Sequence, residues 1–554
     1  MPVESMLNEE RIKKYTLSGL WGNRNFPDYF NESVHKYPDK TAVVGPRGNR
    51  LTYRELNRLS DRVALGLLHM GIKKEDIATV QLPNCVEIVY IYLALAKIGV
   101  IFNPVPATYR NKEIEYIINF SESKIVIIPD VFRRFNYVEM LQELRPNLSS
   151  AKHFFVIGEN VGEGMLSFSE LEKHPWEKEY SPDILEKNKP GANDILGLLY
   201  TSGTEAQPKG VLHTHNTIIS GEIAFAERLK MSSDDVCFMP SPLAHATGFA
   251  HGMTLPFLLG QTSVSLDIWE PENALKLMEK ERCTYSMGAT PFVRTLLDCP
   301  NFRKYDIRSM RYFLCGGAPV PKDLIIQGTN VGLRILPVYG LTESIPHVAG
   351  NPDDPPEKVY GTDGKPCPGI EVKIKDENRK DLPNNEIGEE VSRGPNVCVG
   401  YFKRPDLNEK SFDEEGFFYS GDLALLDNDG NLIIRGRKKD IIIRGGQNIN
   451  VKEVEDLLLN HPKVYNVAIV GMPDVKMGEK SCAYIIPRPN ETVTLDDVTS
   501  FLREKKIALF KLPERVEMID DFPMTPSGKV QKYVLRNRIA RKIEQEAQGS
   551  FGDG

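Results

Sequence analysis

The chain has 554 residues, which is too many for one hydrophobic core, because single cores stop growing at about 250–300 residues. Its 69 lysines and arginines against 76 aspartates and glutamates give a net charge of −7. No dense basic block appears, so nothing indicates a nucleic-acid partner. The eight cysteines lack metal-ligand spacing and are interpreted as reduced thiols.

The sequence also lacks the pattern of a secreted or membrane-spanning protein. Residues 1–14 are charged and have no apolar stretch of the kind found in a signal peptide. The longest apolar run, residues 89–100, is interrupted by Lys97 and is too short to cross a bilayer. We therefore expect a cytoplasmic protein without an integral membrane segment.

Strand and helix patterns alternate through the first part of the chain. A hydroxyl followed by a glutamate and by apolar residues at helical spacing predicts a helix over residues 52–70. A second helix is expected over residues 85–98, and strands are expected at 76–82, 100–105, 124–129, 263–266 and 312–315. This alternation predicts layered α/β units around largely parallel sheets.

The pattern changes twice in the last third of the chain. From Glu371, short alternating segments with Asn-Gly and Asp-Gly turns predict a small β subdomain. After Arg435, a helix at 451–459, strands at 467–470 and 482–486 and a helix at 495–504 predict a small α+β domain. We expect an N-terminal domain over residues 1–437 and a C-terminal domain over residues 438–554, joined near Lys439.

The stretch from Tyr200 to Val211 carries the first chemical signal. Small hydroxyl residues, two glycines, a proline and Lys209 lie there between apolar flanks. Glycines allow close backbone approach, and N–H groups, hydroxyls and an ammonium cradle the oxygens of a polyphosphate. The spacing differs from the common nucleotide P-loop, because Lys209 precedes the closing glycine. Taken alone, the stretch also fits an ordinary Gly/Ser turn.

Six further segments follow in order along the chain. They are Pro242–Gly248, Gly316–Pro319, Tyr339–Glu343, Tyr419–Leu423, residues 436–441 and Pro526–Lys529. Together with the phosphate loop, they closely resemble the adenylate-forming superfamily of acyl-CoA synthetases, peptide-synthetase adenylation domains and luciferases. The resemblance implies a large N-terminal domain of layered α/β sheets with a small β-barrel, and a small mobile α+β C-terminal domain.

The resemblance implies an enzyme that joins a carboxylate to AMP from ATP and then transfers the acyl group. Such a site must hold ATP, neutralise phosphate charge and place the carboxylate in line with the α-phosphate. The expected phosphate contacts come from Thr201, Ser202, Gly203, Thr204 and Lys209. In this chain Glu205-Ala206 stands where many relatives have Thr-Gly, which adds negative charge near the phosphates.

The metal and the nucleoside have their own expected residues. Glu343 is expected to bind Mg²⁺, with Thr204 and Thr342 supplying hydroxyls to phosphate or metal, whereas a solvated loop acid is the alternative for Glu343. The small backbone of Gly316, Gly317, Ala318 and Pro319 should lie against adenine, with Tyr339 stacked on the base. Asp422 should accept both ribose hydroxyls and Arg437 should donate to the same ribose.

Two further side chains are assigned to the reacting groups. Lys529 is expected to reach between the carboxylate and the α-phosphate as negative charge builds there. His245 should close the acyl pocket and move to admit the thiol, although a packed core histidine is the alternative. His213, His215 and His251 are interpreted as structural.

The sequence also gives information on the acceptor of the acyl group and on the acyl group itself. Gly445-Gly446 matches the glycine stretch that lines the pantetheine tunnel of CoA ligases, which favours coenzyme A over a carrier protein or luciferase-like oxygenation. Gly340 stands where acetate- and propionate-type synthetases have a bulky tryptophan. We therefore expect an open pocket for a medium-chain, branched, alicyclic or aromatic carboxylate. A binding scaffold that has lost turnover is a further alternative, which the retention of Lys529, Glu343 and Asp422 disfavours.

Overall fold

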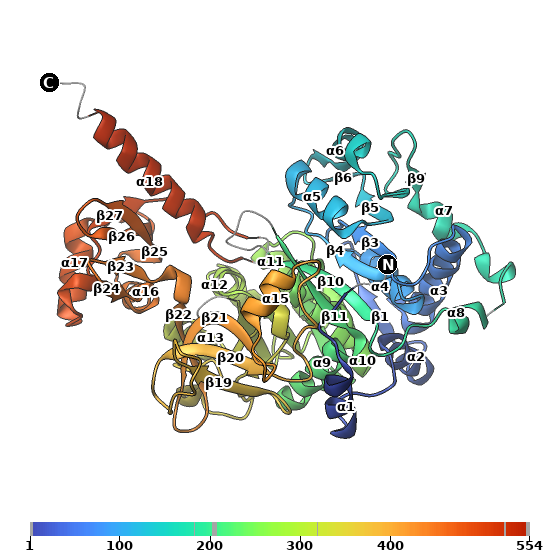
Figure 1. Cartoon of the computed structure of the whole chain (residues 1–554), viewed down its shortest axis with the longest axis horizontal. Helices are drawn as coiled ribbons and strands as arrows, with labels where there is room; N and C mark the ends of the chain where they lie inside the picture. The colour runs from blue at the N-terminus through green and yellow to red at the C-terminus, as the bar shows by residue number, and fades with distance from the viewer. Residues whose placement is uncertain (1–3, 182, 202–207, 318–319, 526–527, 550–554) are drawn as a thin grey trace.

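The computed structural model describes residues 4–181, 183–201, 208–317, 320–525 and 528–549. Figure 1 shows a large N-terminal body of several sheets and a smaller C-terminal body that ends in the long helix α18. The predicted phosphate-loop residues Ser202, Gly203 and Thr204, the pair Glu205-Ala206, and the residues Ala318, Pro319, Pro526 and Ser527 lie outside the described residues.

A seven-stranded sheet carries the first half of the chain. Its strands, in spatial order, are β11 (Lys209–Thr214), β10 (Ile195–Thr201), β4 (Ile101–Pro104), β3 (Ile77–Val80), β5 (Ile125–Pro129), β8 (His153–Ile157) and β9 (Leu166–Ser167). All neighbours are parallel except β10 and β11, which form an antiparallel pair at one edge. The predicted parallel α/β layer is thereby confirmed.

A nine-stranded sheet carries the middle of the chain. Its strands, in spatial order, are β18 (Lys365–Pro366), β17 (Val348–Ala349), β16 (Ile335–Tyr339), β15 (Tyr312–Gly316), β14 (Tyr285–Gly288), β12 (Val236–Met239), β13 (Thr262–Ser265), β1 (Thr41–Val44) and β2 (Arg50–Thr52). The strands from β16 to β1 are parallel, and the ends of the sheet are antiparallel.

The N-terminal body contains the following helices besides its sheets. They are α1 (Glu9–Leu17), α2 (Phe26–Lys36), α3 (Tyr53–His69), α4 (Val86–Lys97), α5 (Asn111–Ser121), α6 (Tyr137–Leu144), α7 (Phe168–Lys173), α8 (Asp183–Lys187), α9 (His215–Leu229), α10 (Leu255–Leu259), α11 (Pro271–Lys280), α12 (Thr290–Leu297), α13 (Lys322–Asn330), α14 (Pro356–Val359) and α15 (Pro405–Ser411). None of the helices in the described part of the chain is long and apolar enough to cross a membrane.

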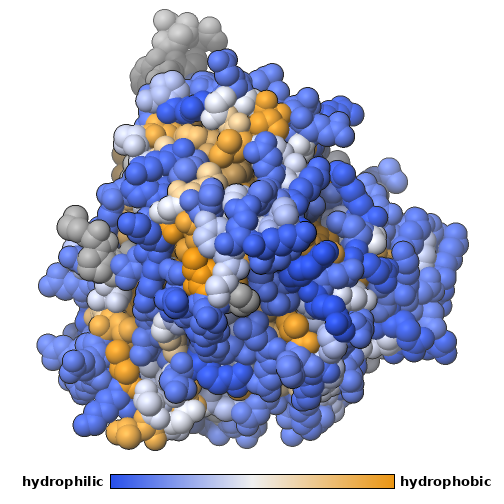
Figure 2. Space-filling model, turned by 90° about the vertical axis from the view of Figure 1, so that its right-hand side faces the viewer, coloured by the Kyte–Doolittle hydropathy of each residue, from blue (hydrophilic) through white to orange (hydrophobic). Residues whose placement is uncertain are grey.

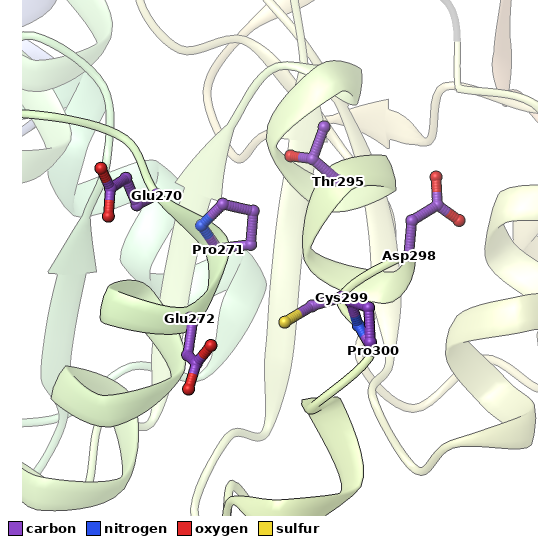
Figure 3. A pocket seen from close by; sticks show the side chains of 7 residues that line it. All are labelled: Glu270, Pro271, Glu272, Thr295, Asp298, Cys299 and Pro300. Atoms are coloured by element: carbon purple, nitrogen blue, oxygen red, sulfur yellow. The ribbon is translucent and has the colours of Figure 1, made fainter.

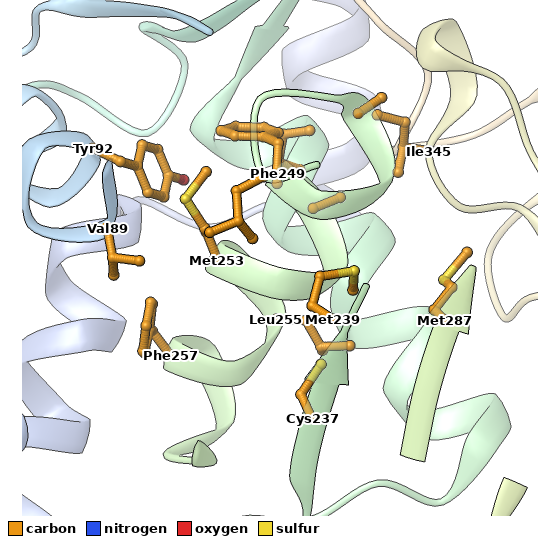
Figure 4. Packing of buried hydrophobic residues seen from close by; sticks show 14 of the residues in the cluster. Val89, Tyr92, Cys237, Met239, Phe249, Met253, Leu255, Phe257, Met287 and Ile345 are labelled. Carbon is orange, nitrogen blue, oxygen red and sulfur yellow. The ribbon is translucent and has the colours of Figure 1, made fainter. Parts of the chain in front are cut away.

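Local sequence explains where these helices begin and which are buried. The predicted helix at 52–70 is α3, which Thr52 starts with a capping box to Glu55. In α4 every residue except Glu87 is buried, as expected of a helix that is apolar on all sides. The largest core joins residues of both sheets, such as Val80 and Phe238, to these helices. Figure 4 shows part of it around Tyr92, Met253 and Phe249.

The predicted β subdomain is a four-stranded antiparallel sheet of β19 (Glu371–Lys375), β20 (Gly388–Arg393), β21 (Phe418–Leu426) and β22 (Leu432–Arg437). No pairing among its described strands closes it, so it is an open sheet where a small barrel was expected. The two outer strands do not pair with each other; each has a single antiparallel bridge elsewhere, from Leu432 of β22 to Gly364 and from Lys375 of β19 to Asp381.

The C-terminal body has a five-stranded sheet of its own. Its elements are β23 (Ile442–Arg444), β24 (Gln447–Ile449), β25 (Val464–Asp474), β26 (Gly478–Pro487), β27 (Arg515–Met518), α16 (Val451–Leu458), α17 (Leu495–Glu504) and α18 (Lys532–Gly549). The helices at 451–459 and 495–504 and both strands were predicted, whereas α18 was not. Between β22 and β23 runs a short 3₁₀ turn, η6 (Lys438–Asp440), which contains Lys439.

The face of the molecule shown in Figure 2 is mainly hydrophilic, with several small groups of apolar residues among the charged ones. Scattered apolar side chains of this kind are normal for a folded protein.

Candidate active site

One cavity collects seven of the predicted site residues, namely His245, Gly316, Gly317, Tyr339, Gly340, Thr342 and Lys529. It is lined by Ser241, His245, Ala246, Thr247, His251, Met287, Gly288, Ala289, Gly316, Gly317, Val338, Tyr339, Gly340, Leu341, Thr342, Ile345, Pro346 and Lys529. The walls include the carboxyl ends of parallel strands β14, β15 and β16, the place where ligands bind in open α/β sheets. Lys529 reaches it from the C-terminal body.

The predicted phosphate loop begins and ends at facing residues. Thr201 at the end of β10 is the register partner of Lys209 at the start of β11. The antiparallel edge pair therefore holds the two ends of the loop side by side, and Gly210 packs so closely that an added Cβ would lie 2.7 Å from Leu198 Cδ1. Lys209 is partly exposed. Burial and then the charge of Arg437 lower the pKa of Lys439, and Lys209 adds to this shift.

The glycines after β15 allow a close backbone approach. An added Cβ on Gly316 would lie 2.4 Å from the carbonyl oxygen of Val338 in β16, so no larger residue fits there. Gly317 has a φ of +77°, which side-chain-bearing residues rarely adopt. These two positions form a thin wall beside Tyr339, as the predicted adenine-binding role requires.

Tyr339, Asp422 and Arg437 form a linked group at the edge of the cavity. The Tyr339 hydroxyl donates to Asp422 Oδ2 at 2.8 Å, and Arg437 Nε lies 2.8 Å from Asp422 Oδ1. Asp422 and Arg437 are register partners on β21 and β22. The carboxylate raises the pKa of Arg437 and holds it charged. The motif spacing alone did not indicate this mutual contact.

Glu343 is held in a buried turn, η5 (Thr342–Ser344). The Tyr401 hydroxyl donates to Glu343 Oε1 at 2.8 Å, and His213 Nε2 lies 2.7 Å from the Thr342 carbonyl oxygen. Burial lowers the pKa of His213 to about 4, so this ring is neutral and donates to the carbonyl. A solvated loop acid does not describe this environment.

The sequence did not indicate that Tyr401 and His213 position this turn. Tyr401 follows an ordinary glycine and has no motif of its own, and His213 was interpreted as structural. Only their contacts with the Thr342-Glu343 turn indicate a link to the site. No group of three or more His, Cys, Asp or Glu residues that could hold a metal occurs within the described ranges.

Lys529 stands on a tight loop of the C-terminal body. Its backbone N–H donates to Thr525 Oγ1 at 3.0 Å, and the Thr525 N–H donates to the Lys529 carbonyl at 2.7 Å. Gly528 has a φ of +82°, and a Cβ there would meet Ala289 at 3.4 Å. Burial, and then the nearby Arg437, lower the pKa of Lys529 to about 8.

His245 lies on the same cavity and is only partly buried. Its Nδ1 accepts from the Thr247 N–H at 3.3 Å, and the Phe249 N–H donates to its carbonyl at 2.8 Å. Burial and the charge of Lys529 lower its pKa to about 3, so the ring is neutral. A ring with so low a pKa does not act as a general acid near neutral pH, whereas the predicted gating role needs no charge.

The structure does not bring Gly445 and Gly446 into this cavity. They form the exposed turn between β23 and β24, with φ of +54° and +84°. Lys439 and these two glycines follow Arg437 in the chain and belong to the C-terminal body. Lys529 belongs to the same body, but unlike the two glycines it lines the cavity.

A second hollow of about 470 Å³ opens elsewhere on the surface, between α11 and α12 (Figure 3). Its lining includes Glu270, Glu272, Asp298 and Cys299 and none of the predicted site residues. Asp298 accepts from the Tyr465 hydroxyl of the C-terminal body at 3.3 Å, so this edge borders the junction of the two bodies.

The fold and the cavity define an α/β protein whose cavity is lined by the N-terminal body and by Lys529 of the C-terminal body. Residues 30–402 match the profile of the AMP-binding enzyme family, and residues 453–529 match that of the AMP-binding enzyme C-terminal domain. The chain belongs to the AMP-binding enzyme family, which confirms the resemblance predicted from its motifs.

Individual relatives cover almost the whole chain. A medium-chain fatty-acid–CoA ligase from Escherichia coli (strain K12) is 40% identical over 99% of this chain and 96% of its own length. A 2,3-dihydroxybenzoate–AMP ligase from Bacillus subtilis (strain 168) is 32% identical over 97% of each. A crystal structure of an anthranilate CoA ligase in complex with anthranoyl-AMP superposes with a TM-score of 0.85 at 25% identity, over 94% of this chain and 98% of its own.

Proposed function

We propose that this protein is an ATP-dependent carboxylate–CoA ligase acting on a medium-chain, alicyclic or aromatic acid. In the first half-reaction a carboxylate oxygen attacks the α-phosphorus of ATP, an acyl-AMP forms and pyrophosphate leaves. In the second, the CoA thiol loses its proton, the sulfur attacks the acyl carbon, a thioester forms and AMP leaves. Membership of the family and the near full-length likeness to a medium-chain CoA ligase support both steps.

The observation that carries the proposal is the meeting of Lys529 with Gly317 in the cavity that also contains His245. An ammonium at this place can stabilise charge as the carboxylate and the α-phosphate react. Arg437 and Lys439 add positive charge nearby, since both affect the pKa of Lys529. The placement therefore suits the adenylating half-reaction.

The remaining residues have proposed roles in holding ATP. Tyr339 and the Gly316-Gly317 backbone would bind adenine, and Asp422 with Arg437 would bind the ribose. Lys209 and Thr201 would bind phosphates, with Ser202, Gly203 and Thr204 of the intervening loop; Ala318 and Pro319 would continue the adenine wall.

Magnesium fits this chain at Glu343. Tyr401 occupies only Oε1, and no residue that the structure describes donates a hydrogen bond to Oε2. Hard carboxylate and hydroxyl oxygens suit Mg²⁺, which keeps water and phosphate oxygens as its other ligands. Glu343 would hold the ion together with Thr342, the preceding residue, and with Thr204 of the predicted phosphate loop, and the ion would neutralise phosphate charge.

For the second half-reaction, Gly445 and Gly446 would line the path of the CoA pantetheine arm after the C-terminal body, residues 438–554, rotates about Lys439. The reason is that one small body carries both these glycines and Lys529, yet only Lys529 faces the cavity.

The eight cysteines are all free, and six of them are buried, which supports a reducing compartment such as the cytoplasm.

A panel of carboxylic acids with ATP, Mg²⁺ and CoA tests the proposal, with thioesters and AMP measured by mass spectrometry. We expect a thioester from at least one medium-chain, alicyclic or aromatic acid, with one AMP per thioester. Release of AMP without thioester would indicate another acceptor. Absence of pyrophosphate exchange with every acid would reject adenylation.

A further inference from the structure

A buried histidine–glutamate pair stands at the wall of the acyl pocket. His251 lines the same cavity as His245 and Lys529 and is 2% exposed, while Glu222 behind it is fully buried. His251 Nδ1 lies 3.0 Å from Glu222 Oε2. The sequence alone suggested only a structural histidine at this position.

The pair leaves hydrogen-bonding capacity unused. Glu222 Oε1 is buried without a partner, and no described residue forms a hydrogen bond with His251 Nε2. Buried polar atoms normally find partners, and one that stays unpaired is costly. The cavity side of the histidine is thus a place where a ligand group can complete the pairing.

The backbone on either side of this pair lies close to the cavity wall. His251 belongs to a π-helical turn, η3 (Gly248–Thr254), and such turns are frequent at functional sites. Gly221, next to Glu222 on α9, approaches the wall so closely that an added Cβ would lie 2.5 Å from the carbonyl oxygen of Ile345. Ile345 itself lines the cavity.

The cavity that His251 lines has apolar side chains, among them Ala246, Met287 and Ile345, and polar ones such as Ser241, His245 and Thr342. None of the described polar residues forms a hydrogen bond with His251 Nε2. Figure 4 shows Met287 and Ile345 near the buried Phe249, Met239 and Met253. An alkyl group placed against His251 would cover a polar nitrogen without pairing it, whereas a polar substituent would pair with it.

We propose that His251, oriented by Glu222, is a specificity-determining residue that selects carboxylic acids with a hydroxyl group on the ring or chain. A hydroxyl both donates and accepts, so it matches the free ring nitrogen in either tautomer of the histidine. This inference rests on the proposed carboxylate–CoA ligase function, and it names the substrate class of that same pocket.

The test compares matched acids that differ by one hydroxyl. The pairs are octanoate with its 3-, 5- and 7-hydroxy forms, cyclohexanecarboxylate with its 3- and 4-hydroxy forms, and benzoate with its 3- and 4-hydroxy forms. With wild-type enzyme, kcat/KM for thioester formation should be severalfold, up to about tenfold, higher for one hydroxy acid than for its parent, as one neutral hydrogen bond allows. A parent acid preferred in every pair would overturn the proposal.

Variants distinguish a role of His251 in substrate selection from a role in protein stability. His251→Leu should abolish the preference by lowering kcat/KM for the hydroxy acid while keeping or raising it for the parent, and His251→Gln should retain part of the preference. Tyr92→Phe removes another buried hydroxyl of this core, which bonds Thr254 at 3.0 Å but does not line the cavity, and should leave the ratio unchanged. Equal effects of His251→Leu and His251→Gln on both acids would show a purely structural role.

Failure of the proposed function gives a different result. In that case wild-type enzyme forms no thioester from any of the acids, hydroxylated or not. If His251→Leu does not fold, as judged by circular dichroism, the ratio measured with Glu222→Gln decides. This near-isosteric change should shift the preference by severalfold through a reoriented ring, and an unchanged ratio would count against the proposal.

Discussion

Lys529 of the C-terminal body packs against Gly317 of the N-terminal body, so closely that an added Cβ on the glycine would lie 3.1 Å from Lys529 Cε. The positive φ of Gly317 and the tight loop of Thr525 and Gly528 fix this contact from both sides. It places one ammonium beside the predicted adenine wall, where the proposed role of Lys529 in adenylation needs it.

The first prediction is that Lys529→Ala abolishes acyl-adenylate formation and largely spares thioester formation from pre-made acyl-AMP. Charge develops at the α-phosphate only in the first half-reaction, and losing one preorganised donor costs about 10²–10³ in rate. Pyrophosphate exchange and CoA transfer are measured separately. Lys532→Ala, which loses the ion pair to Glu455, is the control; equal loss of both half-reactions in Lys529→Ala would contradict the assignment.

A second prediction concerns pH. The pKa of Lys529 is lowered to about 8, so the ammonium is charged below that pH and loses its proton above it. The adenylation kcat/KM, which reports the free enzyme, should therefore fall as pH rises through about 8. Lys529→Arg stays charged and should remove this alkaline limb, even if its rate is lower. A limb that persists in Lys529→Arg would assign it to another group.

The size of the acyl pocket gives a third prediction. A Cβ on Gly340 has its nearest contacts at 3.7–3.9 Å from Pro346, Ser344 and His347, so a side chain can start there without a clash. Gly340→Trp should fill the pocket and shift preference toward acetate or propionate, at roughly 1–3 kcal/mol per methylene. The readout is the ranking of kcat/KM over chain length. Gly340→Ala is the matched control, and an unchanged ranking with tryptophan would place the acyl group elsewhere.

The fourth prediction concerns the junction at Lys439. Proline fixes φ, so Lys439→Pro should hinder a rotation that needs a large backbone change at this residue. Proline fits the φ of a 3₁₀ turn such as η6 but disfavours helical geometry at Lys438, so adenylation should fall modestly at most. CoA transfer from pre-made acyl-AMP should become severely slower.

Lys439→Ala serves as the comparison for that variant, because it removes the side chain and keeps backbone freedom. Wild-type CoA transfer in Lys439→Pro would rule out a pivot at this residue. Loss of CoA transfer in both variants would instead point to the ammonium group.

Patterns of local sequence predicted much of the fold and of the site. The helical period and the capping box identified α3, and the charged and apolar pattern of residues 495–504 identified α17 with its bounds. Motifs identified Tyr339, Thr342, Gly316, Gly317 and Lys529, which the structure brings to one cavity. The open four-stranded sheet and α18 were not foreseen, because strand closure and a mostly polar helix leave weak local signals.

By itself, the sequence determined the family, the α/β class and the motif residues, since each depends on local periodicity or on residue types at fixed spacing. Only the tertiary structure decided that Tyr401 and His213 hold the Glu343 turn, that Tyr339 pairs with Asp422, and that Glu222 stands behind His251. These partners lie 29 to 129 positions apart in the chain, and their contacts arise from the packing of separate elements, which no local pattern encodes.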